Sequence, residues 1–314
     1  MSEKIIISPL DWGLGHATRS TALIRLYLER GAEVEIASSI AHKTYFAQEF
    51  PNLVWHEAPA YGIKYPKHGW QMPFWLFSKI PHIKKIMQEE NKWLSSLCEK
   101  QKYTLVISDN RFGFFNKKIK SVYITHQLRI AFPKAFTLFE RFGEAWHKSI
   151  MKNFDEIWVP DYEKFPGLAG KLSHPSYKSE KIKYIGPLSR LPYVSHPTSQ
   201  TKDIDILALI SGPEPHRTGF EKFMIKFLSD NPGNHCLIRG LPGETDTIDL
   251  PFQVFNHLSA EDLREKILAS RMIMCRSGYS TIMDLHLLNA TAVLFPTPGQ
   301  TEQAYLAKLW RANG

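Results

Sequence analysis

A glycine loop between a predicted strand and a predicted helix is the clearest candidate for chemistry in this chain. Met272-Ile273-Met274 is a short apolar run typical of a buried strand, and Arg276, Ser277 and Gly278 follow it. Tyr279 to Leu288 has the apolar spacing of a helix. Backbone N–H groups at a helix start favour phosphate, and glycine lets a ligand approach closely. The loop therefore predicts a phosphate site, although an ordinary strand–helix connection shows the same pattern.

Acidic and amide side chains near this loop suit the rest of a nucleotide sugar. Asp284 lies six residues after Gly278, where its carboxylate can accept hydrogen bonds from ribose hydroxyls. A further strand is predicted from Thr291 to Phe295, and Glu302 and Gln303 then begin the last predicted helix, where they can face a sugar. A crossover with a surface aspartate is the alternative interpretation.

Two other loops in the second half of the chain also follow predicted strands. The first can offer a hydroxyl and an N–H to a phosphate, with an arginine to balance the charge, and the second can contact a nucleotide base through its backbone. The residues concerned are Ser211, Gly212 and Arg217 in the first loop, and Phe255, Asn256 and His257 in the second. A rigid, proline-stiffened connector and a plain loop are the respective alternatives.

The first half of the chain opens with a second glycine-containing loop. Gly13, Gly15 and His16 follow a predicted strand, Ile5–Ser8. Glycines let the backbone approach a ligand, and histidine titrates near neutral pH, so His16 is predicted to act as a general base. The alternative is a residue that merely caps the helix predicted over Ala17–Arg30.

Polar side chains follow two more strands of the first half. They are Asp109 and Asn110 after the strand Leu105–Ile107, and His126 and Gln127 after the strand Val122–Ile124. Because the carboxyl ends of parallel strands meet at one edge of a sheet, we expect these side chains to lie near His16. Asp109 is predicted as the second candidate for the base, or as the residue that orients the acceptor. An Asx-type turn is the alternative.

The elements that position these loops alternate between strands and helices, which predicts parallel sheets in two Rossmann-like, doubly wound domains. The predicted strands are Ile5–Ser8, Val34–Ala37, Leu53–His56, Leu105–Ile107, Val122–Ile124 and Ile157–Val159, then Ile204–Ile210, Cys236–Ile238, Gln253–Phe255, Met272–Cys275 and Ala292–Phe295. A helix is also predicted near Phe136–Met151. The stretch from Tyr184 to Lys202 contains three prolines. We therefore predict domains at 1–185 and 203–314, joined by a linker at 186–202.

Composition limits the classes of function. The net charge of +8 suits anionic partners, and three cysteines without CxxC spacing give neither a disulfide framework nor a zinc site. No signal peptide and no apolar run of about 20 residues is present, which predicts a cytoplasmic protein. Nucleic-acid motifs are absent. The first domain's opening lacks both the third glycine of GxGxxG and an acid after the second strand, which argues against a dinucleotide dehydrogenase.

An aromatic stretch, Trp70–Phe77, predicts contact with a membrane surface. Bulky aromatics beside lysines suit the interface of an anionic membrane. This pattern predicts that the protein can bind peripherally to the inner face of the membrane. The neighbouring lysines are Lys64, Lys67, Lys79, Lys84 and Lys85. A core-packing helix with a solvated basic face is the alternative.

The donor-side motifs resemble those of GT-B glycosyltransferases, and among these the MurG-like group. The resemblance rests on Arg276-Ser277-Gly278, the acid at Asp284, the Phe295-Pro296 strand end and the Gln303-x-Tyr305 helix. MurG-like enzymes transfer GlcNAc from UDP-GlcNAc to a lipid-linked acceptor. Their helix acid, a glutamate, binds the ribose; Asp284 is one methylene shorter. Their first loop is glycine-rich and ends in histidine, as Gly13 to His16 does, and a loop like that at His126 and Gln127 faces the acceptor.

The resemblance implies a GT-B fold and transfer of a hexosyl group from a nucleotide diphosphate sugar, with UDP favoured, to a hydroxyl. It further implies inversion at the anomeric carbon, and neither a cofactor nor a metal ion, since no acid pair is placed to bind one. The fold usually closes with a helix that returns to the first domain, and that helix is expected to be truncated here. A nucleotide-sugar epimerase of the same fold and a non-catalytic sugar-nucleotide-binding partner protein remain as alternatives.

Overall fold

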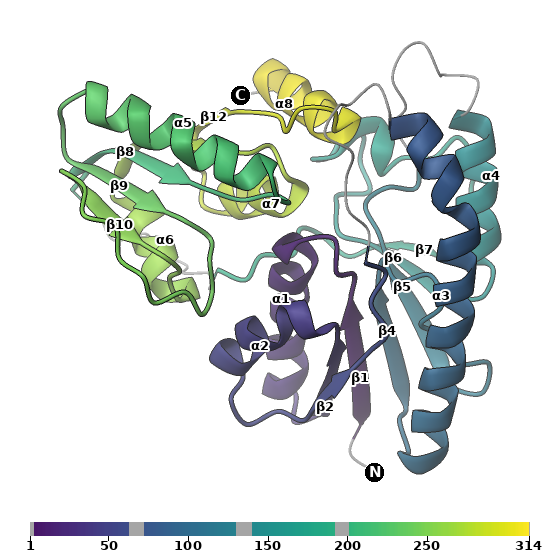
Figure 1. Cartoon of the computed structure of the whole chain (residues 1–314). Coiled ribbons are helices and arrows are strands. Elements are labelled where there is room, and N and C mark those ends of the chain that lie inside the picture. The colour runs from purple at the N-terminus through teal and green to yellow at the C-terminus, as the bar shows by residue number, and fades with distance from the viewer. Residues whose placement is uncertain (1–2, 63–71, 130–139, 192–200, 314) are drawn as a thin grey trace. The chain divides into compact units, whose positions relative to one another are not determined.

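The chain divides into two compact α/β units, Met1–Leu188 and Ser189–Gly314 (Figure 1). The computed structural model describes residues 3–62, 72–129, 140–191 and 201–313, and the side chains of 72–77, 140–142 and 313 are outside this description. Residues 192–200 of the predicted linker, 186–202, lie outside the described residues. The predicted aromatic stretch does so as well, through Trp70 and Gln71 and through the side chains of the six residues that follow them.

Unit 1, Met1–Leu188, is built on a seven-stranded parallel sheet with the order β3-β2-β1-β4-β5-β6-β7. This order reverses between β1 and β4, as in doubly wound nucleotide-binding folds. Its elements are β1 (Lys4–Pro9), α1 (Leu14–Glu29), β2 (Glu33–Ser38), α2 (Lys43–Glu49), β3 (Trp55–Glu57), α3 (Met72–Lys100), β4 (Leu105–Asp109), β5 (Lys120–Ile124), α4 (Glu140–Met151), β6 (Glu156–Val159) and β7 (Ile182–Tyr184), with short 3-10 helices at Ile40–His42 and Gly170–Leu172.

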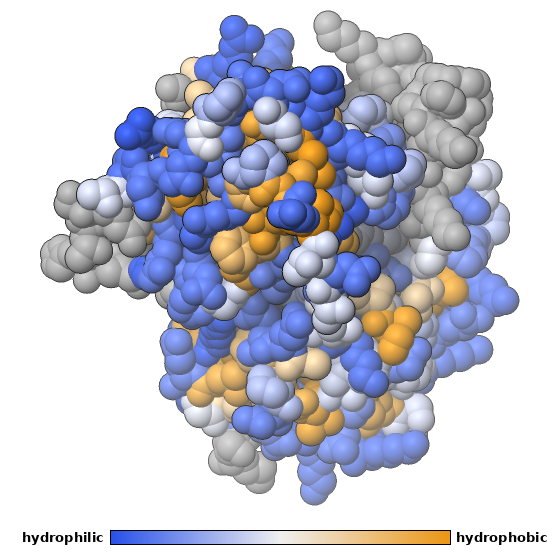
Figure 2. Space-filling view, turned by 60° about the vertical axis from the view of Figure 1, so that its left-hand side comes forward, coloured by the Kyte–Doolittle hydropathy of each residue, from blue (hydrophilic) through white to orange (hydrophobic). Residues whose placement is uncertain are grey.

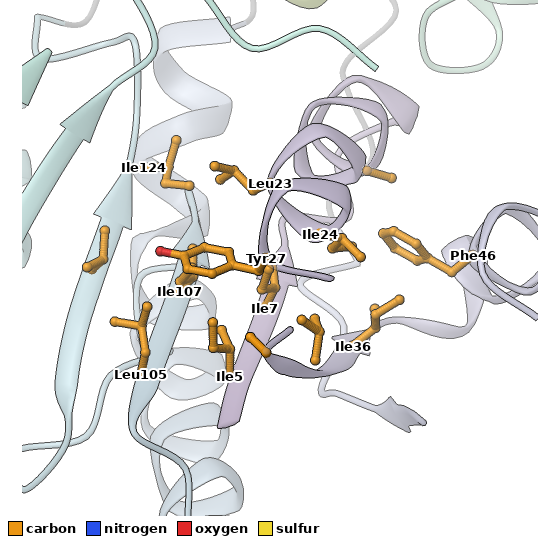
Figure 3. Close-up of a cluster of buried hydrophobic side chains, with 14 of the residues drawn as sticks. Ile5, Ile7, Leu23, Ile24, Tyr27, Ile36, Phe46, Leu105, Ile107 and Ile124 are labelled. Carbon is orange, nitrogen blue, oxygen red and sulfur yellow. The ribbon is translucent and has the colours of Figure 1, made fainter. Parts of the chain in front are cut away.

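Alternation along β1 explains why helices cover both faces of this sheet. Ile5 and Ile7 belong to a core with Leu23 and Ile24 of α1 (Figure 3). Ile6 packs in a separate core with Leu94 of α3. Successive side chains of a strand point to opposite faces, so a continuous apolar run is buried on both. The strand is thereby held rigidly, with its carboxyl end free to present a loop.

The elements of unit 1 that differ from the sequence-based prediction include α1 and β7. Helix α1 begins at Leu14 rather than Ala17, so His16 lies in its first turn and not in a loop. Gly13 has φ 122°, a conformation open to glycine, and the chain turns into the helix directly after it. Strand β7 was not predicted, because its three residues, half-buried or exposed, carry little apolar signal; it pairs with β6 at Ile157↔Ile182.

Unit 2, Ser189–Gly314, holds a five-stranded parallel sheet with the order β10-β9-β8-β11-β12. One face packs on α6 and α7 and the other on α5, through two separate hydrophobic cores. Here the order reverses between β8 and β11. The elements are β8 (Ile204–Leu209), α5 (His216–Asp230), β9 (His235–Ile238), β10 (Gln253–Phe255), α6 (Ala260–Leu268), β11 (Ser270–Cys275), α7 (Tyr279–Leu287), β12 (Ala292–Leu294) and α8 (Thr301–Asn313).

The two parallel sheets confirm the predicted α/β class with two Rossmann-like domains. Among the described residues, no helix is both long and apolar enough to span a bilayer. The face in Figure 2 is largely hydrophilic, with hydrophobic residues gathered in smaller areas. Large hydrophobic side chains that are exposed include Phe165 and Phe223. Exposed apolar residues of this kind are normal on a protein surface.

Candidate functional site

The carboxyl ends of β1 and β4 lie side by side in unit 1, where the strand order reverses. Pro9 is in register with Asp109, and the backbone N–H of Leu10 donates to the carbonyl oxygen of Asp109 at 2.9 Å. The loop after β1 leads within a few residues to His16 in the first turn of α1. In open parallel sheets this reversal point is where ligands bind. The backbone therefore brings His16 and Asp109 to one place although 93 positions separate them.

His16 and Asp109 form a pair in which only the histidine reaches solvent. His16 Nδ1 lies 2.8 Å from Asp109 Oδ1; the His16 side chain is 19% exposed and the Asp109 side chain 0%. A carboxylate accepts hydrogen bonds only, so a proton on Nδ1 donates to Asp109 and leaves Nε2 free to take a proton. The pair has the form of a base held by an acid.

Asp109 is held as a carboxylate by the groups around it. Burial by itself would raise the pKa of Asp109, but Arg19 and His16 outweigh it and hold that pKa well below its usual range. Arg19 Nε donates to Oδ2 at 3.0 Å, Arg19 Nη2 donates to Oδ1, and the Ser20 hydroxyl donates to Oδ2 at 3.1 Å. With its lone pairs occupied in this way, Asp109 is suited to orient His16 rather than to act as a base.

The other acceptor-side residues predicted from sequence gather at the same edge of the sheet. His126, 7% exposed, has its Nδ1 3.2 Å from Arg19 Nη1. Asn110 adopts φ 62° and accepts a hydrogen bond from the Tyr123 hydroxyl at 2.6 Å. The backbone N–H of Gln127 donates to the Thr125 hydroxyl at 3.1 Å. The structure thus brings His126 to the His16–Asp109 pair, and places Asn110 and Gln127 in the loops beside them.

In unit 2 a small cavity brings together three of the predicted donor-side residues. The cavity, of about 90 Å³, is lined by Ser211, His257 and Asp284 together with Arg190, Gly240 and apolar side chains of β8, α6 and α7. Ser211 follows β8 and Asp284 lies on the helix after β11, so the cavity is again at the reversal of strand order. Burial, and secondarily Arg190, lowers the pKa of His257 to about 4, which keeps its ring neutral at pH 7.

Asp284 has a raised proton affinity in this cavity. Burial raises the pKa of Asp284 to about 6, although Arg190 and the hydrogen bond from the Ser189 hydroxyl act in the opposite direction. A carboxyl with this pKa is mostly ionised at pH 7, and an ionised carboxylate is a strong hydrogen-bond acceptor. An ionised Asp284 can therefore accept a hydrogen bond from a hydroxyl group, which is the role predicted for it from the sequence.

The glycine loop after β11 forms a second group. The Ser277 hydroxyl donates to the carbonyl oxygen of Gln303 at 2.8 Å, and Gln303 Oε1 accepts from the backbone N–H of Thr297 at 2.9 Å. These bonds tie the N-terminus of α7 to that of α8. Gly278 has open space where a side chain would begin, the nearest atom being Thr281 Oγ1 at 4.0 Å. A ligand can therefore approach the backbone closely at Gly278, as phosphate binding at a helix N-terminus requires.

Two arginines predicted for the donor side are engaged by protein groups. Arg276 donates to the carbonyl oxygens of His216, Phe295 and Pro296, and its guanidinium lies 4.1 Å from the Phe220 ring centroid. Arg217 pairs with Glu214 and Glu221. Both side chains stabilise the loops around them.

The remaining predicted residues lie in unit 2 as follows: Gly212 has φ 115°, Phe255 ends β10, Asn256 accepts a hydrogen bond from Arg239 at 2.7 Å, and Glu302 lies in the first turn of α8.

Comparisons with known proteins find relatives of the whole chain. No protein-family model matches the chain. A protein described as an uncharacterized glycosyltransferase from Methanosarcina acetivorans is 23% identical over 335 aligned positions, which cover 99% of this chain and 84% of that protein. A second one, from Methanosarcina mazei, is 22% identical with the same coverage. The sequence relatives therefore extend over both units.

Solved structures with a similar fold are GT-B glycosyltransferases. The spinosyn rhamnosyltransferase SpnG matches with TM-score 0.64 and 14% identity, over 98% of this chain and 84% of that one. MurG from Acinetobacter baumannii matches with TM-score 0.53 and 12% identity, over 100% and 83%. The chain has the GT-B fold, and its sequence relatives are described as glycosyltransferases. The predicted enzyme class and resemblance are thereby confirmed, and the same relatives favour transfer over the alternative of an epimerase.

Sequence reasoning missed two groups of residues. Arg19 and Ser20 on α1 hold Asp109, and Ser189 and Arg190 surround Asp284. A signal for Arg19 was available, because it lies three residues after His16 and so shares a face of the helix. Ser189 and Arg190 fall in the stretch predicted to be a linker, and nothing in their spacing points to a partner 95 positions away.

Proposed function

We propose that this glycosyltransferase moves a hexosyl group from a nucleotide diphosphate sugar to a hydroxyl acceptor, with His16 as the general base. The observation that carries the proposal is the pair of His16 with a fully buried, ionised Asp109 at the reversal point of the unit 1 sheet. His16 is the member of the pair that can meet an acceptor, and Asp109 fixes its ring. The sequence-based ranking of His16 first and Asp109 second is kept, with Asp109 as an orienting group.

The proposed reaction needs one proton transfer and one stabilised leaving group. Nε2 of His16 takes the proton of the acceptor hydroxyl as its oxygen attacks the anomeric carbon, and the nucleotide diphosphate leaves from the opposite side, which inverts that carbon. After the transfer the proton resides on His16, where the Asp109 carboxylate stabilises the imidazolium. Backbone N–H groups at the α7 N-terminus, reached past Gly278, stabilise the leaving diphosphate.

We assign the donor to unit 2 for three reasons. The α7 N-terminus is open at Gly278, Asp284 offers a carboxylate one and a half turns further along the helix, and the cavity beside it is lined by Ser211 and His257. Among the similar structures, SpnG is complexed with thymidine diphosphate and a protein from Arabidopsis thaliana with UDP-L-rhamnose. These ligands support a nucleotide diphosphate sugar, and the MurG resemblance favours UDP, with UDP-GlcNAc as an example.

A lipid-linked acceptor at an anionic membrane is the proposed setting of the reaction. Unit 1 carries 27 of the 39 Lys and Arg residues and 18 of the 31 Asp and Glu residues, so it has a net charge of +9 while unit 2 has −1. Positive charge on the unit that holds the proposed base favours docking of that unit on anionic lipid. The lysine-flanked stretch Trp70–Phe77 is the proposed contact.

His16→Ala is the variant that tests the proposal, in a panel of UDP, GDP and TDP sugars with release of the free diphosphate as the readout. Loss of a general base is expected to lower kcat by about 10²- to 10⁴-fold. Affinity for the nucleotide diphosphate, measured by calorimetry, should stay within about twofold, because the donor residues belong to unit 2. His56→Gln is the matched control: His56 pairs with Glu35 on β2, and the variant should turn over normally.

Three results would contradict the proposal in different ways. If His16→Ala retains full turnover while Asp109→Asn loses it without unfolding, the two roles must be exchanged. Epimerised sugar nucleotide without transfer would identify an epimerase. Binding of sugar nucleotides without any turnover by the wild-type protein would identify a non-catalytic partner.

A further inference from the structure

One buried arginine contacts every ionisable member of the proposed acceptor site. Arg19, 3% exposed, donates to both carboxylate oxygens of Asp109, and its Nη1 lies 3.2 Å from His126 Nδ1 and its Nη2 2.9 Å from His16 Nδ1. A guanidinium is planar, carries five N–H donors in a fixed fork and accepts no hydrogen bond. An arginine side chain can therefore contact all three partners at once, which a lysine ammonium cannot do.

The donor-only character of Arg19 determines where protons can reside on its neighbours. Because Arg19 Nη1 can only donate, His126 Nδ1 has to accept, and the proton of a neutral His126 is then on Nε2. His16 Nδ1 lies between Arg19 Nη2 and Asp109 Oδ1; a proton on this nitrogen can be directed only to the carboxylate. With its proton on Nδ1 a neutral His16 keeps an unprotonated Nε2, whereas a neutral His126 carries its proton on Nε2.

The position of Arg19 in the fold makes this arrangement rigid. Arg19 follows His16 by three residues on α1, so both side chains leave the same face of one helix. Asp109 ends β4, and His126 follows β5. One side chain therefore connects α1 to the ends of two neighbouring strands, and it does so where water is excluded and its bonds are strong.

We propose that Arg19 is the positioning residue of the acceptor site: its fork sets the tautomer of His126 and orients the Asp109 carboxylate, which in turn sets the tautomer of His16. In the resulting site His16 has an unprotonated Nε2, which can accept the proton of an acceptor hydroxyl. The catalytic part of this inference rests on the proposed role of His16. The part about the tautomers does not depend on that role.

The tautomers are measured directly by two-bond ¹H–¹⁵N correlation spectra of protein labelled with ¹⁵N-histidine, without substrate. In the wild-type protein we expect His16 protonated on Nδ1 and His126 on Nε2. Arg19→Met should turn at least one of them into a mixture of tautomers. Arg19→Lys keeps the charge but supplies a point donor that cannot span three partners, so it should fold normally and still show the mixture.

Kinetics give the second readout. We expect kcat of Arg19→Lys to fall by about 10- to 100-fold, the loss of one charge-assisted hydrogen bond, with the KM for the donor within about twofold. Arg25→Met is the matched control, since Arg25 lies on the same helix but pairs with Glu49 of α2. It should change neither kcat nor the spectra.

Arg19→Met leaves the Asp109 carboxylate buried without its cation and can fail to fold. The double variant Arg19→Met with Asp109→Asn removes both charges and keeps the shapes. It should fold and should show His126 as a mixture of tautomers.

Wild-type tautomers in Arg19→Lys and in the double variant would overturn the proposal, as would a His16 that is protonated on Nε2 in the wild-type protein. So would a fall in kcat without any change of tautomer. A wild-type protein that transfers no sugar would contradict the proposed function, while the spectra would still decide on Arg19.

Discussion

Replacing Asp284 by asparagine should stabilise unit 2 at neutral pH and weaken nucleotide binding at the same time. Burial raises the pKa of Asp284 to about 6, about two units above that of an aspartate in an unfolded chain. Between pH 4 and pH 6 the folded state therefore binds more protons than the unfolded state. The stability that Asp284 contributes is fully present below pH 4 and is lost as the pH rises through 6.

The magnitude follows from the size of this shift. Two pKa units correspond to about 3 kcal/mol at pH 8, and partial exposure of the side chain makes about 1–3 kcal/mol the expected range. Asp284→Asn removes the group that titrates. The free energy of unfolding of Asp284→Asn in urea, relative to that of the wild type, should therefore increase by about 1–3 kcal/mol between pH 4.5 and pH 8. Asp230→Asn is the control: Asp230 forms an exposed pair with Lys226, and its effect should stay below about 1 kcal/mol.

The same variant should lose affinity for UDP, because an amide replaces a carboxylate as acceptor of the ribose hydroxyls. Loss of a charge-assisted hydrogen bond corresponds to about 1.5–3 kcal/mol, or about 10- to 150-fold in Kd at pH 8. UDP affinity of the wild-type protein should fall below pH 6, as Asp284 takes up a proton, and that of Asp284→Asn should not. Unchanged UDP affinity in calorimetry at pH 8 would remove Asp284 from the donor site. A stability difference independent of pH would refute the raised pKa.

Three further outcomes are expected. Asp109→Asn should lower the free energy of unfolding by about 3–5 kcal/mol in urea denaturation, because it leaves the Arg19 guanidinium buried without an anion; a loss below about 1 kcal/mol would contradict the ion pair. Gly278→Ala should fold with a stability within about 1 kcal/mol of wild type, since open space awaits the methyl group, yet bind UDP at least about tenfold more weakly by calorimetry if phosphates pack on the α7 N-terminus. The wild-type protein should co-sediment with anionic vesicles, less so at high salt, and Trp75→Ser with Phe77→Ser should abolish the salt-resistant part; protein that remains in the supernatant at low salt would favour a soluble acceptor.

Much of the fold was predictable because the strands of a parallel sheet are buried on both faces. Such strands read as short apolar runs, and their positions are visible without any knowledge of their partners. The predicted strand Gln253–Phe255 has the same bounds in the structure, and α7 begins at Tyr279 as predicted. The loops that follow these strands were predicted to meet at one edge for the same reason. Strand β7 was missed because a three-residue strand at the edge of a sheet carries no such run.

The sequence by itself therefore determined the α/β class, the two sheets and the loops in which functional side chains are found. The tertiary structure alone decided how each charged side chain is used, because a buried charge needs a partner and that partner is usually far away in the chain. It joined Asp109 to Arg19 and His16 across about 90 positions, and it gave Asp284 a raised pKa through burial beside Ser189 and Arg190. It also made Arg276 a hydrogen-bond donor to three backbone carbonyl oxygens. Spacing along a chain places residues on a face, whereas only packing removes water from them and so sets their protonation and their partners.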